Sequence, residues 1–166
     1  MKVLILNGPN LNLVGKREPE IYGDVTIDSY IDEFLRPLSK QLRTQSGDIV
    51  EVSVFQSNSE GEIVTRIQDA CYGSAKQRVD AIILNAGAYS HYSLAIVDAI
   101  RAITVPVYEV HLSNIYAREE VRRHSVISAV CAGVIAGFGM EGYSMALLAA
   151  VRRGEMYNTQ NERRND

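Results

Sequence analysis

The chain has 166 residues, of which 46% are hydrophobic and 22% charged, with a formal net charge of −3 and a pI near 5.6. This composition excludes wholesale disorder, and the length fits one domain of ordinary size. No stripe of Lys and Arg alternates with aromatic residues, so a nucleic-acid-binding protein is not favoured.

Strands and helices are predicted to alternate along the chain. A buried strand over Val3–Leu6 is followed by a long loop and then by a helix whose apolar residues run from Ile27 to Leu42. Thr26 is the expected N-cap of that helix, and Pro37 inside it should cause a kink, at a cost of about 3 kcal/mol if unrelieved. The later elements are predicted as a strand over 49–57, a helix carrying residues 63–71, a strand over 81–87, a helix over 94–103, strands over 105–113 and 131–137, and a helix over 143–153.

Five strands that alternate with helices indicate an α/β fold, in which a parallel sheet is covered on both faces. We predict a flavodoxin-like three-layer sandwich with the strand order 2-1-3-4-5. Ligands bind such sheets beyond the carboxyl ends of the strands. Residues 1–153 are expected to form a single domain, and the polar segment 154–166 a flexible C-terminal tail.

The cysteines and the N-terminal residues indicate the cellular compartment in which we expect the protein. Cys71 and Cys131 share no CxxC spacing and are expected to be free thiols in a reducing environment. The apolar run before Asn7 is too short for a signal peptide or a membrane span. We therefore expect a cytoplasmic protein.

Residues 137–142 read GFGMEG, which matches the glycine pattern of a dinucleotide site. That fingerprint also needs a further strand that ends in an acidic residue about 20 positions later. Here the chain continues into its polar tail, so we interpret the glycines as allowing close packing of a strand against a helix. No GxxxxGK[ST] motif occurs, and nucleotide chemistry is not supported.

Polar residues follow the predicted carboxyl ends of three strands, where we expect them to meet. They are Asn7 and Asn10, then Asn85, Tyr89 and His91, then Glu109, His111, Leu112 and Ser113. Glu109 and His111 are two residues apart on a strand and should point to the same face. A carboxylate beside a histidine raises its proton affinity, which suits a general acid. A surface Glu–His pair is the alternative, and a metal site is weaker because no third ligand stands at a recognisable spacing.

His91 and Asp98 are seven residues apart and are predicted to lie on one side of one helix. A Ser–His–Asp hydrolase would need a serine in a GxSxG elbow, and none is present. Ser90 and Ser93 are therefore predicted to be residues at a helix start. His124 is assigned to the surface.

Three arginines, Arg118, Arg122 and Arg123, cluster after the fourth strand. One of them would suit an anionic small substrate. The alternative is that they are solvated or pair with Glu119 and Glu120.

The segment 7–23 is rich in Gly, Pro and Asn and carries Arg17 and Tyr22. Ordinary connections have about 2–6 residues, so this length favours a functional lid over a plain solvated loop. Tyrosine has a reference pKa of about 10, and half ionisation near pH 7 requires a shift of about three units, or about 4 kcal/mol. A neighbouring guanidinium favours the phenolate. The segment is therefore predicted to carry a base on a lid.

Three segments resemble the signature regions of the type II 3-dehydroquinate dehydratase family, and the resemblance extends to about Arg153. They read NGPNLNLVGKREPEIYG, LNAGAYSHYSLAIVDAI and EVHLSNIYAREEVRRHS. The resemblance implies a flavodoxin-like fold, no cofactor or metal, and a dodecamer built from trimers. It also implies that the chain is a lyase that dehydrates 3-dehydroquinate to 3-dehydroshikimate, in the shikimate pathway to chorismate and aromatic amino acids or in quinate breakdown.

Residue by residue, the resemblance implies that Tyr22 abstracts the C2 proton next to the ketone, with Arg17 holding it as the phenolate. His111, supported by Glu109, would protonate the departing C1 hydroxyl, and Asn10 would place a water at the enolate oxygen. The implied substrate-binding residues are Asn85, His91, Asp98, Leu112, Ser113 and Arg122. Asp98 matches a position that reaches into a neighbouring subunit's site.

The chain departs from the family pattern at four positions. Ala86 stands where proline is usual, Tyr92 where a small hydroxyl residue is usual, Tyr116 where histidine is common and Val121 where an aromatic is common. None removes a proton-transfer group. Two alternatives stay open: an imine-forming Lys16 beside Arg17, and a non-catalytic flavin-binding module of the same architecture.

Overall fold

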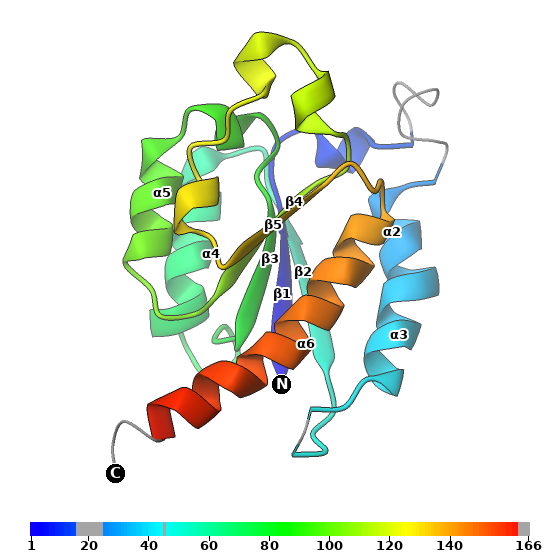
Figure 1. Cartoon of the computed structure of the whole chain (residues 1–166), viewed down its shortest axis with the longest axis vertical. Coiled ribbons are helices and arrows are strands. Elements are labelled where there is room, and N and C mark those ends of the chain that lie inside the picture. The colour runs from blue at the N-terminus through cyan, green and yellow to red at the C-terminus, as the bar shows by residue number, and fades with distance from the viewer. Residues whose placement is uncertain (16–24, 45, 163–166) are drawn as a thin grey trace.

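The computed structural model describes residues 1–15, 25–44 and 46–162, with residues 154–162 as backbone only. Parallel strands form a five-stranded sheet in the order β2-β1-β3-β4-β5, which confirms the predicted order (Figure 1). The strands are β1 (Lys2–Asn7), β2 (Glu51–Gln56), β3 (Ala81–Asn85), β4 (Val107–His111) and β5 (Gly133–Ala136). The register pairs Asn7 with Asn85, so the carboxyl ends of β1 and β3 lie level at one edge of the sheet.

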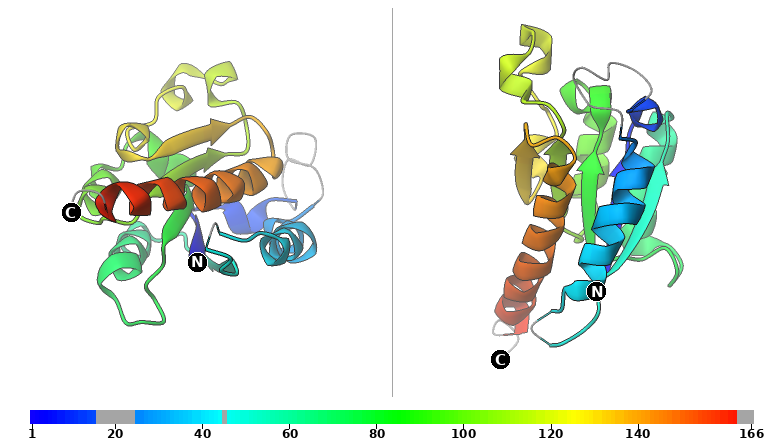
Figure 2. Two further views of the ribbon diagram at one scale, coloured as in Figure 1. Left: turned by 60° about the horizontal axis from the view of Figure 1, so that its bottom comes forward. Right: turned by 90° about the vertical axis from the view of Figure 1, so that its right-hand side faces the viewer.

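Helices cover both faces of the sheet. The elements α4 and α5 lie on one face, and α2, α3 and α6 lie on the other (Figures 1 and 2). Their bounds are α2 (Ile27–Tyr30), α3 (Arg36–Gln41), α4 (Glu60–Tyr72), α5 (Leu94–Arg101) and α6 (Glu141–Glu162). Short 3₁₀ turns lie in the connections, at Leu11–Leu13, Gly87–His91, Ile115–Ala117, Glu120–Arg122 and Ser128–Val130.

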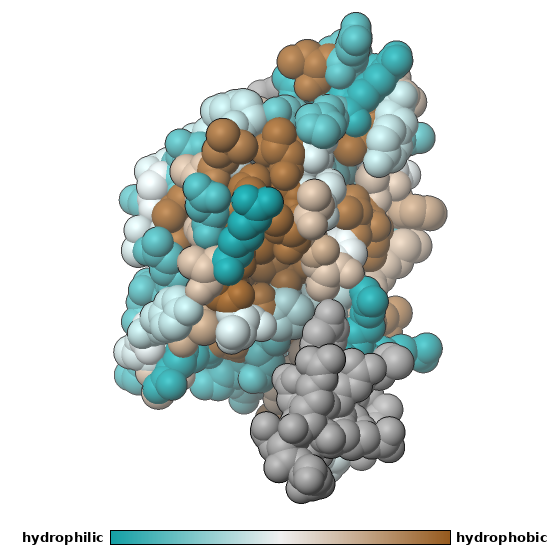
Figure 3. Space-filling model, turned by 60° about the vertical axis from the view of Figure 1, so that its left-hand side comes forward, coloured by the Kyte–Doolittle hydropathy of each residue, from teal (hydrophilic) through white to brown (hydrophobic). Residues whose placement is uncertain are grey.

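The strands divide their side chains between the two layers by simple alternation. Leu4 and Leu6 pack toward α4 and α5, where they meet Ile63 and Ile96. Full burial of each such side chain contributes about 1.5–3 kcal/mol relative to exposure. Outside this layer, Leu94 of α5 stays exposed, and Figure 3, which brings the α5 side forward, shows apolar residues gathered in the middle of that face.

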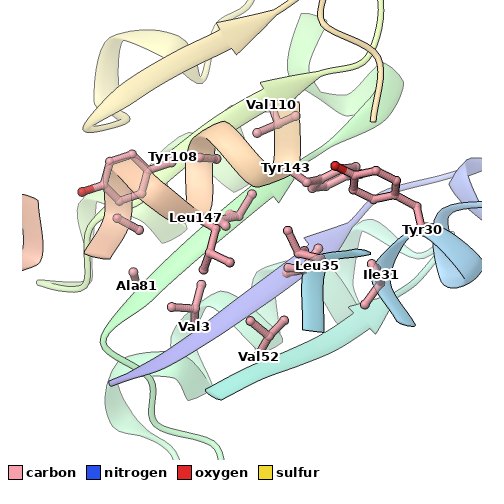
Figure 4. Packing of buried hydrophobic residues seen from close by; sticks show 14 of the residues in the cluster. Val3, Tyr30, Ile31, Leu35, Val52, Ala81, Tyr108, Val110, Tyr143 and Leu147 are labelled. Carbon is pink, nitrogen blue, oxygen red and sulfur yellow. The ribbon is translucent and has the colours of Figure 1, made fainter. Parts of the chain in front are cut away.

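The opposite layer receives the alternate strand residues. Val3 belongs to one apolar cluster with Leu35 from the helical segment before β2 and with Tyr143 and Leu147 from α6 (Figure 4). Both Tyr143 and Leu147 are fully buried. The sheet is therefore covered on both faces, which leaves the strand ends as the place where polar groups can reach solvent.

The helix predicted over 27–42 contains a π turn in place of a simple kink. Thr26 caps its start as predicted, because the Thr26 hydroxyl accepts a hydrogen bond from the Ser29 N–H. Residues Ile31–Leu35 then form a π-helical segment, in which the Arg36 N–H donates to the Ile31 carbonyl. This wider turn places Pro37 in the first turn of α3, where its missing N–H costs little.

The GFGMEG segment leads from β5 into α6. A Cβ atom on Gly142 would lie 3.2 Å from Val110 Cγ1 of β4, so glycine permits the close approach of α6 to the sheet, as predicted. The helix continues to Glu162, past its predicted end at Arg153. Within the described ranges, no helix is both long enough and apolar enough to cross a membrane.

Candidate active site

A pocket of about 160 Å³ lies beyond the carboxyl ends of β1, β3 and β4, at the edge where the sequence places the polar residues. Its lining combines amide, imidazole and guanidinium groups with a few apolar side chains. The lining residues are Pro9, Asn10, Leu11, Val14, Asn85, Gly87, Ala88, His91, His111, Leu112, Ser113, Ile115, Arg118 and Arg122.

Most of the predicted site residues that the structure describes meet in this pocket. Glu109 does not line it but lies directly behind His111. Arg17 and Tyr22 fall within residues 16–24, outside the described part of the chain.

Asp98 is not brought to the pocket of its own chain. His91 belongs to the 3₁₀ turn Gly87–His91, and α5 begins separately after the Ser93 N-cap, so the prediction of one shared helix face is wrong. The Ser93 hydroxyl accepts from the Ile96 N–H, which confirms its predicted place at a helix start. The Asp98 side chain is 77% exposed and lies 3.9 Å from Arg101.

A buried histidine–carboxylate pair forms the back of the pocket. His111 Nε2 lies 2.6 Å from Glu109 Oε1, and the two side chains are 7% and 0% exposed. The alternation of β4 brings them to the same face, as predicted, and their burial excludes the alternative of a surface pair. Because the carboxylate accepts from Nε2–H, Nδ1 is the ring nitrogen that this bond leaves for another partner.

Two serine hydroxyls complete the surroundings of Glu109. Ser125 Oγ donates to Oε1 at 2.6 Å, and Ser128 Oγ donates to Oε2. Burial acts to raise the pKa of Glu109, but the hydrogen bonds from His111, Ser125 and Ser128 outweigh it, and the pKa lies below its ordinary value. The carboxylate is therefore ionised at neutral pH and accepts the hydrogen bond from His111 Nε2.

Asn85 is held by a buried network behind the pocket. Its Nδ2 donates to the Tyr143 hydroxyl at 3.2 Å, and the Tyr143 hydroxyl donates to Asn7 Oδ1 at 2.7 Å. Asn85 Oδ1 accepts from the Gly87 N–H at 3.2 Å. Burial raises the pKa of Tyr143, so its hydroxyl keeps its proton and remains a donor. This network fixes which end of the Asn85 amide faces each neighbour.

We expect Tyr143→Phe to lower the free energy of unfolding by about 1–3 kcal/mol, because Asn7 and Asn85 each lose a partner in a buried place. Denaturant titration would measure this loss. Tyr30→Phe is the matched control, because the Tyr30 hydroxyl pairs with the Ser144 hydroxyl in a partly buried place and should cost less. If both variants lost the same free energy of unfolding, the Tyr143 hydroxyl would not have the stabilising role described here.

Asn10 enters the pocket in an unusual backbone conformation. Its φ of 64° lies in the left-handed region, which asparagine tolerates better than most residues. The Asn10 N–H donates to Asn58 Oδ1 at 2.9 Å, and the Asn58 carbonyl accepts from the Tyr89 hydroxyl at 2.7 Å. The loop after β2 therefore fixes the start of the segment that leads to residues 16–24.

His91 lies beside His111 with its ring nearly parallel, at 6.3 Å between centroids and 19° between planes. Its Nδ1 lies 2.8 Å from the His124 carbonyl oxygen. Since a carbonyl only accepts, Nδ1 carries a proton in this contact. The His124 side chain is exposed as predicted, and its backbone carbonyl orients the His91 ring.

Arg118 and Arg122 bring positive charge to the pocket from the connection after β4. Arg122 Nε donates to Glu119 Oε1 at 2.7 Å, so the predicted alternative of pairing with Glu119 is realised, yet Arg122 also lines the pocket. A guanidinium has five N–H donors, and one such pair leaves others for an anion.

The chain is similar to known proteins in both sequence and structure. The family model described as dehydroquinase class II matches residues 1–151. The chain belongs to the class II dehydroquinase family. It is 47% identical over 151 residues to the 3-dehydroquinate dehydratase of Pelotomaculum thermopropionicum, covering 90% of this chain and 96% of the relative. It is 50% identical over 148 residues to that of Caldicellulosiruptor bescii, covering 89% and 94%. The crystal structure of type II dehydroquinase from Butyrivibrio crossotus matches with a TM-score of 0.77 and 40% identity, covering 90% of this chain and 97% of that one.

Several groups in this dehydroquinase pocket were not predicted from the sequence. Ser125, Ser128 and Tyr143 act behind the lining residues, and their hydroxyls gave no local pattern that separates them from surface or core positions. Leu11, Val14 and Ile115 supply an apolar wall. Their only sequence signal is their position within two of the three segments that resemble the family signatures.

Proposed function

We infer that the chain is a 3-dehydroquinate dehydratase, a hydro-lyase that converts 3-dehydroquinate to 3-dehydroshikimate and water. The observation that carries this inference is the buried Glu109–His111 pair at the back of a pocket that Arg118 and Arg122 border. A pair of this kind supplies a proton, and the arginines suit the carboxylate of the substrate. Family membership supports the same reaction.

The base is proposed to be Tyr22, with Arg17 beside it. The phenolate would take the proton from C2, next to the C3 ketone, and the electron pair would form an enolate. Asn10 would place a water at the enolate oxygen. Because a guanidinium stays charged throughout, it lowers the free energy of the phenolate relative to the phenol.

The acid is proposed to be His111. Its Nδ1–H would donate to the C1 hydroxyl as the C1–O bond breaks, so that one water leaves and a C1=C2 double bond forms while the ketone is restored. Glu109 accepts a hydrogen bond from Nε2 and so holds the ring in place for this step. Afterwards Tyr22 returns its proton to solvent and His111 takes one up, which restores the starting state.

The other pocket residues are proposed to bind the substrate. Asn85 and His91 would hold its ring hydroxyls, since one offers an amide and the other the Nε2 of an imidazole. Leu112 and Ser113 would contribute their backbone groups, and Arg122 would bind the carboxylate.

The assembly is proposed to be a dodecamer built from trimers, in which Asp98 enters a neighbouring subunit's site. The exposed Asp98 carboxylate and the apolar area on the α5 side support this arrangement (Figure 3). Residues 1–153 are proposed to act as a single catalytic domain. A cytoplasmic location is supported by the two free cysteines, Cys71 and Cys131.

The decisive experiment is to incubate the protein with 3-dehydroquinate and follow the ultraviolet absorbance of the conjugated product, with and without borohydride. We expect turnover that borohydride does not stop, because no imine forms. A borohydride-trapped adduct on Lys16 would replace this mechanism with a Schiff-base mechanism. A flavin-coloured preparation without turnover would favour the flavin-binding alternative.

A further inference from the structure

The Glu109 carboxylate has hydrogen-bond donors on both of its oxygens. His111 Nε2 and Ser125 Oγ both lie 2.6 Å from Oε1, and Ser128 Oγ donates to Oε2. The two serines come from the segment that returns from the arginine-bearing connection toward β5. A hydroxyl placed against a carboxylate acts as its donor, so both serines stabilise the negative charge.

Anchoring of that segment does not require the two hydroxyls. The Val126 N–H donates to the Ser90 carbonyl at 2.8 Å, and the Val130 N–H donates to the Ile127 carbonyl at 3.0 Å. The Ile127 side chain is fully buried. The Ser125 hydroxyl also lies 3.3 Å from the Ser90 carbonyl, but it is much closer to Glu109 Oε1, at 2.6 Å. Since backbone bonds and apolar packing already hold the segment, the main contact of both serine hydroxyls is with Glu109.

We propose that Ser125 and Ser128 are positioning residues for the dehydration, and that their hydroxyls hold Glu109 ionised and aligned with His111 Nε2. This inference rests on the proposed function, because it assumes that His111 is the acid. In this arrangement the serines influence His111 indirectly. Their hydroxyls hold the Glu109 carboxylate, and the carboxylate in turn accepts the hydrogen bond from His111 Nε2.

Removal of the serine hydroxyls should raise the pH at which the Glu109–His111 pair loses its proton. Without the hydroxyl donors, the negative charge of Glu109 is less dispersed, and the pair binds its shared proton more tightly. The pair then loses that proton at a higher pH and is a weaker acid. A serine that merely supports the fold would lower activity without moving this titration.

Within the described part of the chain, Cys131 and His91 also face the pair. Cys131 is a neutral thiol, because burial and the charge of Glu109 raise its pKa to about 12. The His91 ring lies 6.3 Å from the His111 ring, and its Nδ1 contacts the His124 carbonyl. Neither Cys131 nor His91 contacts the Ser125 or Ser128 hydroxyl, so the alanine variants leave both groups in place.

The test is the pH dependence of kcat for Ser125→Ala, Ser128→Ala and the double variant. In the double variant we expect kcat at neutral pH to fall about tenfold and KM to stay within about threefold. The alkaline limb of the kcat profile should move upward by about one pH unit. Ser125→Thr and Ser128→Thr keep the hydroxyls, so the alkaline limb of their kcat profiles should lie close to that of the unaltered protein.

Ser46→Ala is the control, because Ser46 Oγ donates to Asp48 Oδ2 at the same length of 2.6 Å but in the turn before β2, away from the pocket. It should leave the profile unchanged. A lower kcat with an unmoved limb in the single and double alanine variants would overturn the inference. His111→Gln, assayed in parallel, separates the two levels: an active His111→Gln would overturn the acid itself, whereas an inactive one beside unaffected serine variants would overturn only the role of the serines.

Discussion

Replacing His111 by glutamine is expected to lower kcat by about 10³-fold, within the usual range for loss of a general acid. The glutamine amide can reach the place of Nε2 and still donate to Glu109 Oε1, so the buried carboxylate keeps a partner. What is lost is the proton on Nδ1. We therefore expect a folded protein with a nearly unchanged KM, which steady-state kinetics and thermal unfolding would measure together.

His124→Gln is the matched control for this experiment. The chemical change is the same, but the His124 side chain is exposed and only its carbonyl contacts His91. Its kcat should remain within about twofold of the unaltered protein, as for other surface substitutions. If His111→Gln kept more than a tenth of the activity, another group would have to supply the proton.

Replacing Tyr22 by phenylalanine is expected to lower kcat by about 10³-fold, because the ring remains and only the ionisable hydroxyl is removed. The proposed phenolate requires about 4 kcal/mol of stabilisation near pH 7, and an arginine beside it supplies this most directly. The acid limb of kcat/KM in the unaltered protein should report the ionisation of Tyr22, and this limb should be absent from the residual activity of the variant.

Tyr72→Phe is the control for the tyrosine change. Tyr72 is 69% exposed at the end of α4, and its hydroxyl donates to the Ala102 carbonyl at the end of α5; neither residue lines the pocket. This variant should keep the activity and the pH profile of the unaltered protein. Rapid turnover by Tyr22→Phe would preserve the substrate assignment but exclude tyrosinate as the base.

The parts of the fold that follow from short-range pattern were predictable. The continuous apolar runs of β1 and β3 indicated strands buried on both faces, and the regular succession of strands and helices indicated a parallel sheet. The contact between Glu109 and His111 follows from the two-residue period of side chains along a strand. Each of these inferences needs only neighbouring residues in the sequence.

The contacts that were missed depend on how irregular segments return to the sheet. Ser125 and Ser128 are 16 and 19 residues from Glu109. The segment that joins Glu109 to these serines has no periodic pattern of apolar residues from which its path could be predicted. Tyr143 is 58 residues from Asn85 and looks like an ordinary apolar helix residue. Pro37 predicted a distortion, but the π turn that accommodates it depends on packing of Ile31 and Leu35 against the sheet.

Both described ends of the chain lie at the edge of the sheet opposite the pocket (Figure 1). The amino group of Met1 donates to the Ile49 carbonyl at 2.8 Å near the start of β2, and α6 runs away from the pocket toward Glu162. A tag, a surface linker or a second protein joined near Met1 or Glu162 would therefore start on the side of the molecule opposite the pocket. The enzyme should be suited to immobilisation through its termini with its active site facing the solution.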